Sequence, residues 1–358
     1  MYTDLTTLCI NTDNSMHEAI AQIEVNRIGI VLVVDPKKRL VGTVTDGDLR
    51  RTILAGISLD EPVSVLLARK TESPFAKPIT AQEDAGRAAF INLLNQYSIR
   101  HLPLVDHDQR VVALVTSDDF YPYPERPMQA VIMAGGMGTR LRPLTDNLPK
   151  PMLPVGNRPL MEIIVNQLRD ANISHVNVSV YHESEKITNY FGDGSKFGVK
   201  MTYVTEDQPL GTAGALGLME EPKETVLVIN GDILTQVDFR AMRDYHQEHS
   251  ADLTVAVQQY DLQVPYGIVE CEGAAIQSIS EKPVLKFFVN AGIYLLEPSV
   301  YSFIPHDERY DMTDLIQRLL SEGRSVVAFP IREYWSDIGQ HSDYEQAQEQ
   351  IKKWQQNP

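Results

Sequence analysis

The segment from Ala134 to Pro151 places glycines and two cations in an order that suits the binding of a phosphate chain. Its first seven residues read AGGMGTR, directly after the apolar stretch 130–133, and its second half contains Lys150. Glycines that follow a buried strand let backbone N–H groups approach an anion closely, because no Cβ stands in the way. Arg140 adds a planar guanidinium that matches phosphate oxygens, and Lys150 adds a mobile point charge. The segment is therefore a candidate phosphate-binding loop.

The spacing of this loop excludes two common phosphate-binding motifs. A dinucleotide-binding fingerprint needs a third glycine at position 141, where the sequence has Leu141. A Walker A loop that began at Gly135 needs Gly-Lys at positions 140 and 141, where the sequence has Arg-Leu. A tight turn with surface charges remains as the purely structural alternative.

Alternating strand and helix patterns surround the loop in the later two thirds of the chain. Strands are predicted at 130–134, 175–180, 200–204, 225–229, 253–258, 267–270 and 288–296. Helices are predicted at 159–171, 183–191, 212–219, 238–249 and 344–354. Such alternation indicates crossover units and a largely parallel sheet, whose ligands bind at the carboxyl ends of the strands. The candidate loop follows a strand and is therefore expected at such an end.

Two copies of one pattern occupy the first 120 residues. Each copy has a helical stretch (16–26 and 82–97) followed by two β-branched strands and a closing Thr-x-x-Asp. Thr45 and Thr116 are 71 positions apart, and Asp48 and Asp119 have the same offset. Aligned repeats at one offset predict two copies of one supersecondary unit.

The sequence divides into domains at a proline-rich stretch. Three prolines fall within 122–127, which predicts a semi-rigid linker because proline breaks both helices and sheet ladders. The predicted organisation is a first repeat at 1–60, a second at 61–122, a linker at 121–127 and a larger domain at 128–358.

Composition narrows the class of protein. The 358 residues are 43% hydrophobic and 22% charged, as expected of a globular chain with two or three domains. A net charge of −16 argues against a nucleic-acid partner, which would need a basic face. The sequence shows neither an apolar run long enough to span a membrane nor a secretion signal at its start. Cys9 and Cys271 are expected as free thiols, and the protein is expected in the cytoplasm.

The complete string from Gly135 to Pro151 closely resembles the signature of the nucleotidyltransferases that activate sugar 1-phosphates. It reads Gly-Gly-x-Gly-Thr-Arg-Leu-x-Pro-x-Thr and then Pro-Lys-Pro, a long and specific motif. Further motifs of this family follow in order up to about residue 345, among them Asn-Gly-Asp at 230–232 and Trp-Ser-Asp-Ile-Gly at 335–339. The resemblance implies an α/β, Rossmann-like domain with a mixed, mostly parallel sheet.

The resemblance also implies roles for individual residues. Arg140, Lys150 and Asp232 match the catalytic positions, and Asp232 with Asp337 matches a pair of ligands for Mg²⁺, a cation that prefers oxygen. The implied nucleotide-binding residues are Ala134, Gly135, Gly136, Gly138, Thr139, Glu206, Gly211 and Thr212. The implied sugar-phosphate-binding residues are Tyr266, Gly267, Glu281, Lys282 and Asn290.

The implied reaction joins a nucleoside triphosphate to a sugar 1-phosphate and releases pyrophosphate. A phosphate monoester, with a second pKa near ~6, is already ionised at neutral pH and can attack without a general base. The reaction therefore needs charge neutralisation and an in-line geometry.

The amino-terminal repeats resemble a pair of cystathionine β-synthase (CBS) domains. In that family such pairs bind adenine nucleotides between the copies, which would place a regulatory nucleotide on Thr45, Asp48, Thr116 and Asp119. The second copy departs from the pattern, with Ala113 where the first has Gly42. Many such pairs serve only in assembly, so a homo-oligomer is expected and a sensory role is a hypothesis.

The order of the two modules favours one substrate pair. A CBS pair ahead of this transferase type resembles the guanylyltransferases that make GDP-glucosamine for bacterial legionaminic acid synthesis. Glu206 fits guanine because a carboxylate can accept from both the N1–H and N2–H₂ groups. Mannose 1-phosphate guanylyltransferase and glucose 1-phosphate thymidylyl- or uridylyltransferase remain alternatives, as does a non-catalytic nucleotide sensor.

Overall fold

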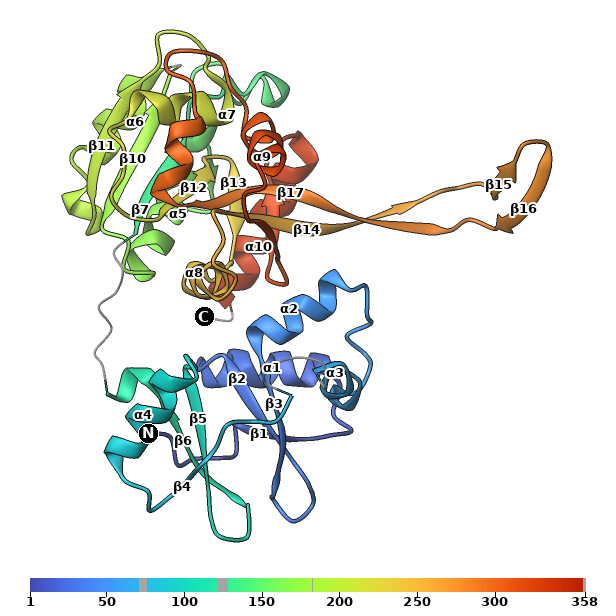
Figure 1. The fold of residues 1–358 in the computed structure, drawn as a ribbon. Helices are drawn as coiled ribbons and strands as arrows, with labels where there is room; N and C mark the ends of the chain where they lie inside the picture. The colour runs from blue at the N-terminus through green and yellow to red at the C-terminus, as the bar shows by residue number, and fades with distance from the viewer. Residues whose placement is uncertain (71–75, 121–127, 182, 357–358) are drawn as a thin grey trace. The chain divides into compact units, whose positions relative to one another are not determined.

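The computed structural model describes residues 1–70, 76–120, 128–181 and 183–356 (Figure 1). The chain folds as two compact units, Met1–Arg126 (unit 1) and Pro127–Pro358 (unit 2). The stretch 121–127, predicted to be a linker, lies outside the described residues. Unit 1 is shown in blue and cyan in Figure 1, and unit 2 in green to red.

Unit 1 contains two small sheets with the same strand order. The first half consists of β1 (Cys9–Asn11), α1 (Met16–Asn26), β2 (Ile30–Val34), β3 (Leu40–Thr45), α2 (Asp46–Leu54) and α3 (Val63–Arg69). The second half contains β4 (Ala81–Gln82), α4 (Arg87–Gln96), β5 (His101–Val105) and β6 (Val111–Thr116). In each sheet the outer strand is parallel to the middle one, and the third strand is antiparallel. The predicted repeat is therefore confirmed.

Local sequence explains how the first repeat is built. Ser15 and Glu18 form a capping box at the start of α1, since each side chain accepts from the backbone N–H of the other residue. Every residue of β2 is buried, as expected for a strand covered on both faces. One cluster of buried side chains contains Leu8, Ile30 and Leu32 of the first repeat together with Val111 and Leu114 of the second. The two repeats therefore share part of their core.

Unit 2 is built on a seven-stranded sheet in the order β11-β10-β7-β12-β17-β14-β18. Its strands are β7 (Gln129–Met133), β10 (His175–Val180), β11 (Lys200–Thr205), β12 (Val226–Asn230), β14 (Leu253–Gln263), β17 (Val284–Leu296) and β18 (Val326–Pro330). Its longer helices are α5 (Leu160–Asp170), α6 (Ser184–Phe191), α8 (Phe239–Glu248), α9 (Met312–Ser321) and α10 (His341–Gln356). The first four strands in the sheet order are parallel, and β17 runs antiparallel to both of its neighbours. The expected mixed, mostly parallel α/β sheet is confirmed.

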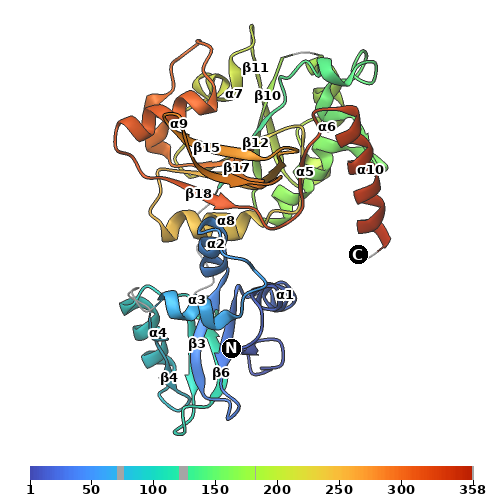
Figure 2. The ribbon, with the colours of Figure 1, turned by 90° about the vertical axis from the view of Figure 1, so that its right-hand side faces the viewer.

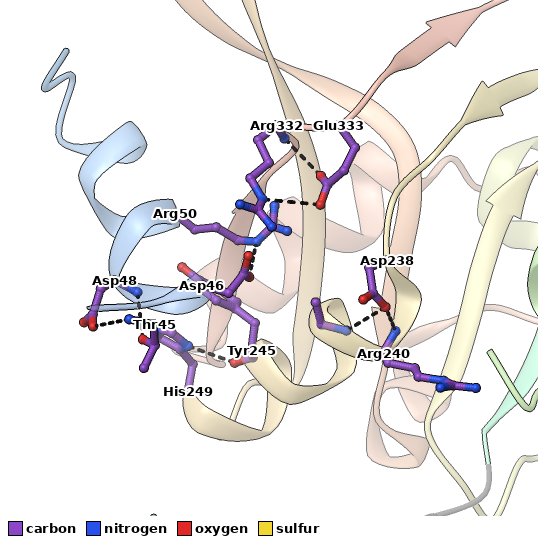
Figure 3. Close-up of polar contacts among 11 residues, drawn as sticks. Thr45, Asp46, Asp48, Arg50, Asp238, Arg240, Tyr245, His249, Arg332 and Glu333 are labelled. Atoms are coloured by element: carbon purple, nitrogen blue, oxygen red, sulfur yellow. Dashed lines mark hydrogen bonds and ion pairs between the residues drawn. The ribbon is translucent and has the colours of Figure 1, made fainter. Parts of the chain in front are cut away.

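Helices cover both faces of this sheet, with α5 and α6 on one side and α9 on the other (Figure 2). The helix α5 buries a continuous apolar stripe against the sheet, formed by Leu160, Met161, Ile164, Val165 and Leu168. Asp238 caps α8 by accepting from the backbone N–H groups of Arg240 and Ala241 (Figure 3). Helix boundaries thus follow ordinary capping chemistry.

The strands β14 and β17 continue beyond the sheet as a two-stranded ribbon. The sequence predicted three short strands at 253–258, 267–270 and 288–296, and this prediction was too short for the first and third. β14 and β17 pair from Leu253↔Leu296 out to Gln263↔Val284, and β15 (Ile268–Glu272) pairs with β16 (Ala275–Ser280) at the far end. The ribbon projects from the rest of unit 2 in Figure 1 and points toward the viewer in Figure 2.

Two helical elements differ from the sequence prediction. The expected helix 212–219 is only one turn of α-helix, α7 (Gly211–Gly214), followed by a 3₁₀ turn at Ala215–Leu218. Glycine has a low helix propensity, and Gly214 and Gly217 lie against the backbone carbonyls of residues 308 and 305, so packing determines this shape. The helix α9 was not predicted. Within the described residues, no helix is long and apolar enough to cross a membrane.

Candidate active site at the switch point of the sheet

The candidate loop begins at the end of β7, in the middle of the parallel part of the sheet. From β7 the chain proceeds outward through β10 and β11, and it then returns to β12 on the other side of β7. Such a reversal of strand order opens a crevice at the carboxyl ends of the two central strands, where ligands bind in this class of sheet. The loop after β7 and the Gly231–Asp232 turn after β12 flank this crevice, because Met133 is paired with Asn230.

Glycines allow the two turns to touch. The N–H of Gly231 donates to the carbonyl of Met133 at 2.9 Å. A Cβ on Gly231 would lie 3.0 Å from that same oxygen and 3.1 Å from Cγ of Pro151. Gly138 has a φ of +61°, and a Cβ there would lie 2.9 Å from Cγ2 of Thr145. A side chain at Gly231 would therefore push the loop away from the end of β12, and one at Gly138 would disturb the packing within the loop itself.

Lys150, Asp232 and Asp337 converge in this crevice. Nζ of Lys150 lies 2.5 Å from Oδ2 of Asp232 and 3.6 Å from Oδ1 of Asp337. The Lys150 residue is only 7% exposed, so its charge is directed inward to these carboxylates. Three residues separated by up to 187 positions in the sequence, 150 to 337, thus form one charged cluster.

A small antiparallel pair of strands brings the two acids together. β13 (Ile233–Thr235) pairs with β19 (Trp335–Asp337), and Ile233 lies opposite Asp337. The N–H of Ile338 donates to the carbonyl of Asp232 at 3.0 Å, which extends this pairing by one residue. The indole N–H of Trp335 donates to the carbonyl of Ala291, so β19 is also attached to β17. Trp335 thus anchors β19 to the sheet.

The electrostatics of the cluster suit a divalent cation. Burial raises the pKa of Asp337 above its usual value, and the neighbouring charge of Asp232 adds to this, while Lys150 and Arg140 act in the opposite direction. Oδ1 of Asp232 is buried without a hydrogen-bond partner among the described residues. A buried acceptor beside a second carboxylate fits a hard cation that accepts oxygen ligands.

The number of protein ligands also fits Mg²⁺. No group of three or more His, Cys, Asp or Glu side chains suitable for a metal occurs in the part of the chain that the structure covers. Mg²⁺ is commonly held by one or two carboxylates, and substrate phosphates and water complete its coordination shell. Asp232 and Asp337 are the residues that would hold such an ion here.

Arg140 lies on the rim of the crevice, in the 3₁₀ turn Thr139–Leu141. Both of its terminal nitrogens lie 3.7 Å from the position that a Cβ on Gly339 would take. An open hollow of about 400 Å³ is lined by Arg140 together with Gln340, His341 and Ser342 at the start of α10. Residues 340–342 were not among the predicted site residues, although they directly follow the Trp-Ser-Asp-Ile-Gly motif.

Glu206 occupies a structural position beneath the glycine loop. It is buried, its Oε1 accepts from the hydroxyl of Ser179, and its Oε2 accepts from the N–H of Leu210 at 2.9 Å. A Cβ on Gly135 would lie 2.8 Å from Oε1, so Glu206 supports the loop from below. The predicted contact with a guanine base stays a prediction, and it would add to these internal hydrogen bonds because each carboxylate oxygen can accept more than one.

The predicted nucleotide-binding residues Gly211 and Thr212 join α7 to α9. The N–H of Thr212 donates to Oδ1 of Asp311, and its hydroxyl accepts from the N–H of Met312 at 2.8 Å. Gly211 has a φ of +81°, and a Cβ there would lie 2.5 Å from Oδ1 of Asp311. The hydroxyl of Thr212 therefore acts within the protein as a cap on α9.

The predicted sugar-phosphate residues fall into two places. Asn290 lies near the crevice, where its side chain accepts from the N–H of Gly292 at 3.0 Å. Tyr266, Gly267, Glu281 and Lys282 lie on the projecting ribbon and are all exposed. Gly267 and Glu281 are neighbours there, since a Cβ on Gly267 would lie 3.1 Å from Oε2 of Glu281. Within one chain, the structure thus gathers these residues on the ribbon rather than at the Lys150–Asp232–Asp337 cluster.

In unit 1, the four residues predicted to bind a regulatory nucleotide form two capping boxes. The side chains of Thr45 and Asp48 exchange hydrogen bonds with each other's backbone N–H, and Thr116 and Asp119 repeat the arrangement (Figure 3 shows the first). Asp48 also accepts from Lys70 at 2.7 Å. The two Thr-x-x-Asp turns therefore have the same local structure in both repeats. Each Asp already has hydrogen-bond partners within unit 1.

Comparison with known protein families assigns each of the two units to a family. The family model described as nucleotidyl transferase matches residues 129–354, which include every residue of the crevice. The chain belongs to the nucleotidyl transferase family. The CBS domain model matches residues 3–55 and 74–123, so a CBS pair precedes the nucleotidyl transferase domain.

Proteins named as sugar-1-phosphate nucleotidyltransferases are similar to this chain over about three fifths of its length. A UTP–glucose-1-phosphate uridylyltransferase of Synechocystis is 35% identical over 62% of this chain and 62% of its own length. A probable mannose-1-phosphate guanylyltransferase of Oryza sativa subsp. japonica is 34% identical over 61% of this chain and 63% of its own. The match therefore spans less than two thirds of these relatives.

Solved structures agree on the fold. A protein of Bacillus anthracis, provisionally named a glucose-1-phosphate thymidylyltransferase and crystallised with sucrose, superposes with a TM-score of 0.53 at 28% identity. The match covers 62% of this chain and 94% of that one. HddC from Yersinia pseudotuberculosis gives a TM-score of 0.50 at 26% identity and covers 62% and 99%. The nucleotidyl transferase fold is thus common to all three chains.

Proposed function

We propose that this protein transfers a nucleotidyl group from a nucleoside triphosphate to a sugar 1-phosphate and releases pyrophosphate. The observation that carries this proposal is the convergence of Lys150, Asp232 and Asp337 at the switch point, beside a glycine loop that bears Arg140. The family match and the names of the relatives support the same reaction.

The chemistry requires a new bond at the α-phosphorus of the triphosphate. An oxygen of the sugar phosphate attacks this phosphorus, the bond to the bridging oxygen breaks, and pyrophosphate leaves with the electron pair. The attacking phosphate is ionised at neutral pH, so no side chain needs to remove a proton. This fits a crevice that contains cations and carboxylates.

The residues of the crevice would act by charge and position. Arg140, on the rim, would neutralise the leaving pyrophosphate, and Lys150 would stabilise the negative charge around the α-phosphorus. When bound, Mg²⁺ would be held by Asp232 and Asp337 and would supply further neutralisation of the phosphates. Lys150 also keeps both carboxylates in place, because its Nζ contacts each of them.

The finer proposal is GTP as the nucleotide and glucosamine 1-phosphate as the sugar substrate. The order of a CBS pair followed by a nucleotidyl transferase domain supports it. The relatives named as guanylyltransferases act on mannose 1-phosphate, and others are named as uridylyl- or thymidylyltransferases. Mannose 1-phosphate with GTP, and glucose 1-phosphate with UTP or dTTP, are therefore the alternatives.

A substrate panel tests the reaction and its specificity. Pyrophosphate release would be measured with five nucleoside triphosphates, each combined with the 1-phosphates of glucosamine, mannose and glucose in the presence of Mg²⁺. We expect the highest rate with GTP and glucosamine 1-phosphate. A higher rate with another pair would reassign the substrates, and no release with any pair would favour a non-catalytic nucleotide sensor.

The variant Asp232→Asn tests the mechanism. It keeps the shape of the side chain but removes the charge that would bind the cation, so turnover should fall by a factor of about 10² or more even at saturating Mg²⁺. Glu345→Gln, at an exposed position on α10, is the matched control and should retain wild-type activity. Retention of most activity in Asp232→Asn would remove this residue from the mechanism.

Unit 1 would regulate this reaction by binding an adenine nucleotide. The match to the CBS family and the two Thr-x-x-Asp turns at equivalent positions support this second proposal. Its ligand would have to compete with partners that Asp48 and Asp119 already have within unit 1.

A further inference from the structure

The projecting ribbon of unit 2, here called the arm, comprises residues 258–289. No residue in this range is buried. Nineteen large apolar side chains are exposed in the described part of the chain, and nine of them lie on the arm. They are Tyr260, Leu262, Tyr266, Val269, Ile276, Ile279, Val284, Phe287 and Phe288. So dense a group of exposed apolar side chains marks a surface that binds another surface.

One face of the β14–β17 part of the arm is mostly apolar. Residues opposite each other in an antiparallel pair share a face, and every second residue returns to it. Tyr260 lies opposite Phe287, and two positions further along the strand Leu262 lies opposite Leu285. The other face is mixed, because Gln259, Asp261 and Gln263 of β14 lie opposite Phe288, Lys286 and Val284 of β17.

The arm lacks support from the rest of unit 2, here called the body. β14 is paired with β18 as far as Val257↔Pro330, and a register irregularity lies between Val255 and Val257 where the ribbon leaves the body. A two-stranded ribbon alone is marginally stable in water, so a third surface must cover its apolar face. At about 3.3 Å per residue, the 15 residues from 258 to 272 reach on the order of 50 Å, enough to cross a neighbouring body.

The arm carries an acid and a cation in a fixed local shape. Lys282 has a φ of +44°, a conformation that non-glycine residues seldom adopt, and the carbonyl of Pro283 accepts from the N–H of Val264 at 3.0 Å. The carboxylate of Glu281 lies against Gly267 on the opposite strand. Strained backbone of this kind is concentrated at functional sites.

The body has a site that this group would complete. The charges of Arg140 and Lys150 only offset those of Asp232 and Asp337, whereas the reaction brings together two negatively charged phosphate substrates. At the same edge, the side-chain oxygen of Asn230 is buried without a partner among the described residues. The site thus needs a further cation and further polar partners.

We propose that two copies of this chain exchange arms. Each arm lies on the partner's body with its Tyr260–Phe287 face buried, and it places Glu281 and Lys282 beside the Lys150–Asp232–Asp337 cluster of the other copy. A reciprocal exchange covers both arms with one closed two-fold interface. The arrangement rests on the proposed function, because Lys282 binds the sugar phosphate in a site whose carboxylates come from the partner.

Mixed dimers test the exchange directly. Asp232→Asn and Lys282→Ala chains with different affinity tags would be co-expressed, and dimers that carry both tags would be purified. Each variant alone should have little activity. With exchanged arms, one of the two sites in a mixed dimer has an intact Asp232 and an intact Lys282, so about half of the wild-type activity should return. If the arm serves its own chain, neither site is complete and mixed dimers stay as inactive as their parents.

The mass of the protein in solution tests the exchange of arms independently of enzymatic activity. Tyr260→Ser with Phe287→Ser makes the apolar face polar and should lower the solution mass from two copies toward one. Gln259→Ser with Gln263→Ser, on the opposite face, is the matched control and should leave the mass unchanged. An inactive wild type would contradict the proposed reaction, whereas equal masses for the two variants would contradict the exchange of arms.

Discussion

At the scale of residues, the crevice depends on one lysine placed between two carboxylates. Lys150 is nearly buried and contacts Asp232 and Asp337, which would otherwise repel each other. Sequence reasoning named all three residues and assigned them to one site. It did not identify the internal role of Glu206, because a buried carboxylate that supports a loop and an exposed one that binds a base look the same in a sequence.

Asp48 gives unit 1 a defined dependence on pH. Burial alone would raise the pKa of Asp48, but Lys70, the backbone N–H of Thr45 and Arg51 together hold it below its usual value. A carboxyl with a lowered pKa in the folded state stabilises that state above the pKa of the unfolded chain, about 3.9. This stabilisation is lost as the pH falls through the lower, folded-state pKa.

The variant Asp48→Asn should therefore destabilise unit 1 at neutral pH, by about 2–3 kcal/mol, since Lys70 loses its partner. The difference from the wild type should shrink as the pH is lowered below about 4, because the unfolded chain then takes up a proton at Asp48, and it should vanish as the pH falls through the lower, folded-state pKa. Hydrogen exchange of the amides in β2, measured between pH 3 and 7 on the whole chain, reports this difference. The exposed Asp13→Asn is the control, and a constant effect of Asp48→Asn at every pH would contradict the assignment.

At the scale of elements, contacts between distant segments decided the shapes that sequence patterns missed. The stretch 212–219 has a helical pattern, yet glycines packed against residues 305 and 308 restrict its α-helix to one turn. The ribbon was divided into short strands because its turn residues resemble strand ends. The pairing of β14 with β17 over ten residue pairs extends both strands beyond those signals.

Gly211 should tolerate no side chain, since its backbone is left-handed and closely packed. Gly211→Ala would place a Cβ 2.5 Å from Asp311 and 2.8 Å from the carbonyl of Tyr310. Strain and overpacking together should lower the free energy of unfolding by about 2–4 kcal/mol. Both tryptophans of the chain are in unit 2, so fluorescence during denaturation follows this loss.

Gly323→Ala is the matched control for this measurement. Gly323 also has a positive φ, of +69°, but nothing lies within 4 Å of the position of its missing Cβ. Only the backbone strain should remain, at a cost of about 1 kcal/mol. Equal losses in the two variants would show that packing against α9 is not what requires glycine at position 211.

At the scale of the whole molecule, a CBS pair is joined to a nucleotidyl transferase domain. If an adenine nucleotide on unit 1 changes the affinity of unit 2 for its triphosphate by some factor, thermodynamic linkage requires the same factor in the reverse direction. A regulatory role of unit 1 therefore predicts that the two nucleotides change each other's affinity, whereas a role in assembly alone does not.

Calorimetry on the full-length Asp232→Asn variant measures this coupling without turnover. AMP and ADP should bind, and their affinity should change when a saturating triphosphate substrate is present. Asp119→Asn should weaken the binding because it alters one of the two Thr-x-x-Asp turns. The absence of binding heat with AMP, ADP and ATP would leave unit 1 with a role in assembly alone.

The sequence by itself determined the repeats and the α/β class of unit 2, and it predicted the residues of the crevice. These properties depend on local patterns, such as glycines after an apolar strand or Thr-x-x-Asp at a fixed offset, and such patterns are visible in the order of the residues. Arg140, Lys150, Asp232 and Asp337 were predicted from the resemblance of their motifs to those of the family.

Only the tertiary structure decided which of these residues lie close together. The pairing of β13 with β19 brings Asp337 to Asp232, and the length of the ribbon carries Glu281 and Lys282 away from both. Such proximity arises because segments that are distant in the sequence pair and pack against each other. The free energy of folding depends on these contacts, and no local sequence pattern encodes them. The same physics leaves the arm with an apolar face that one chain alone does not cover.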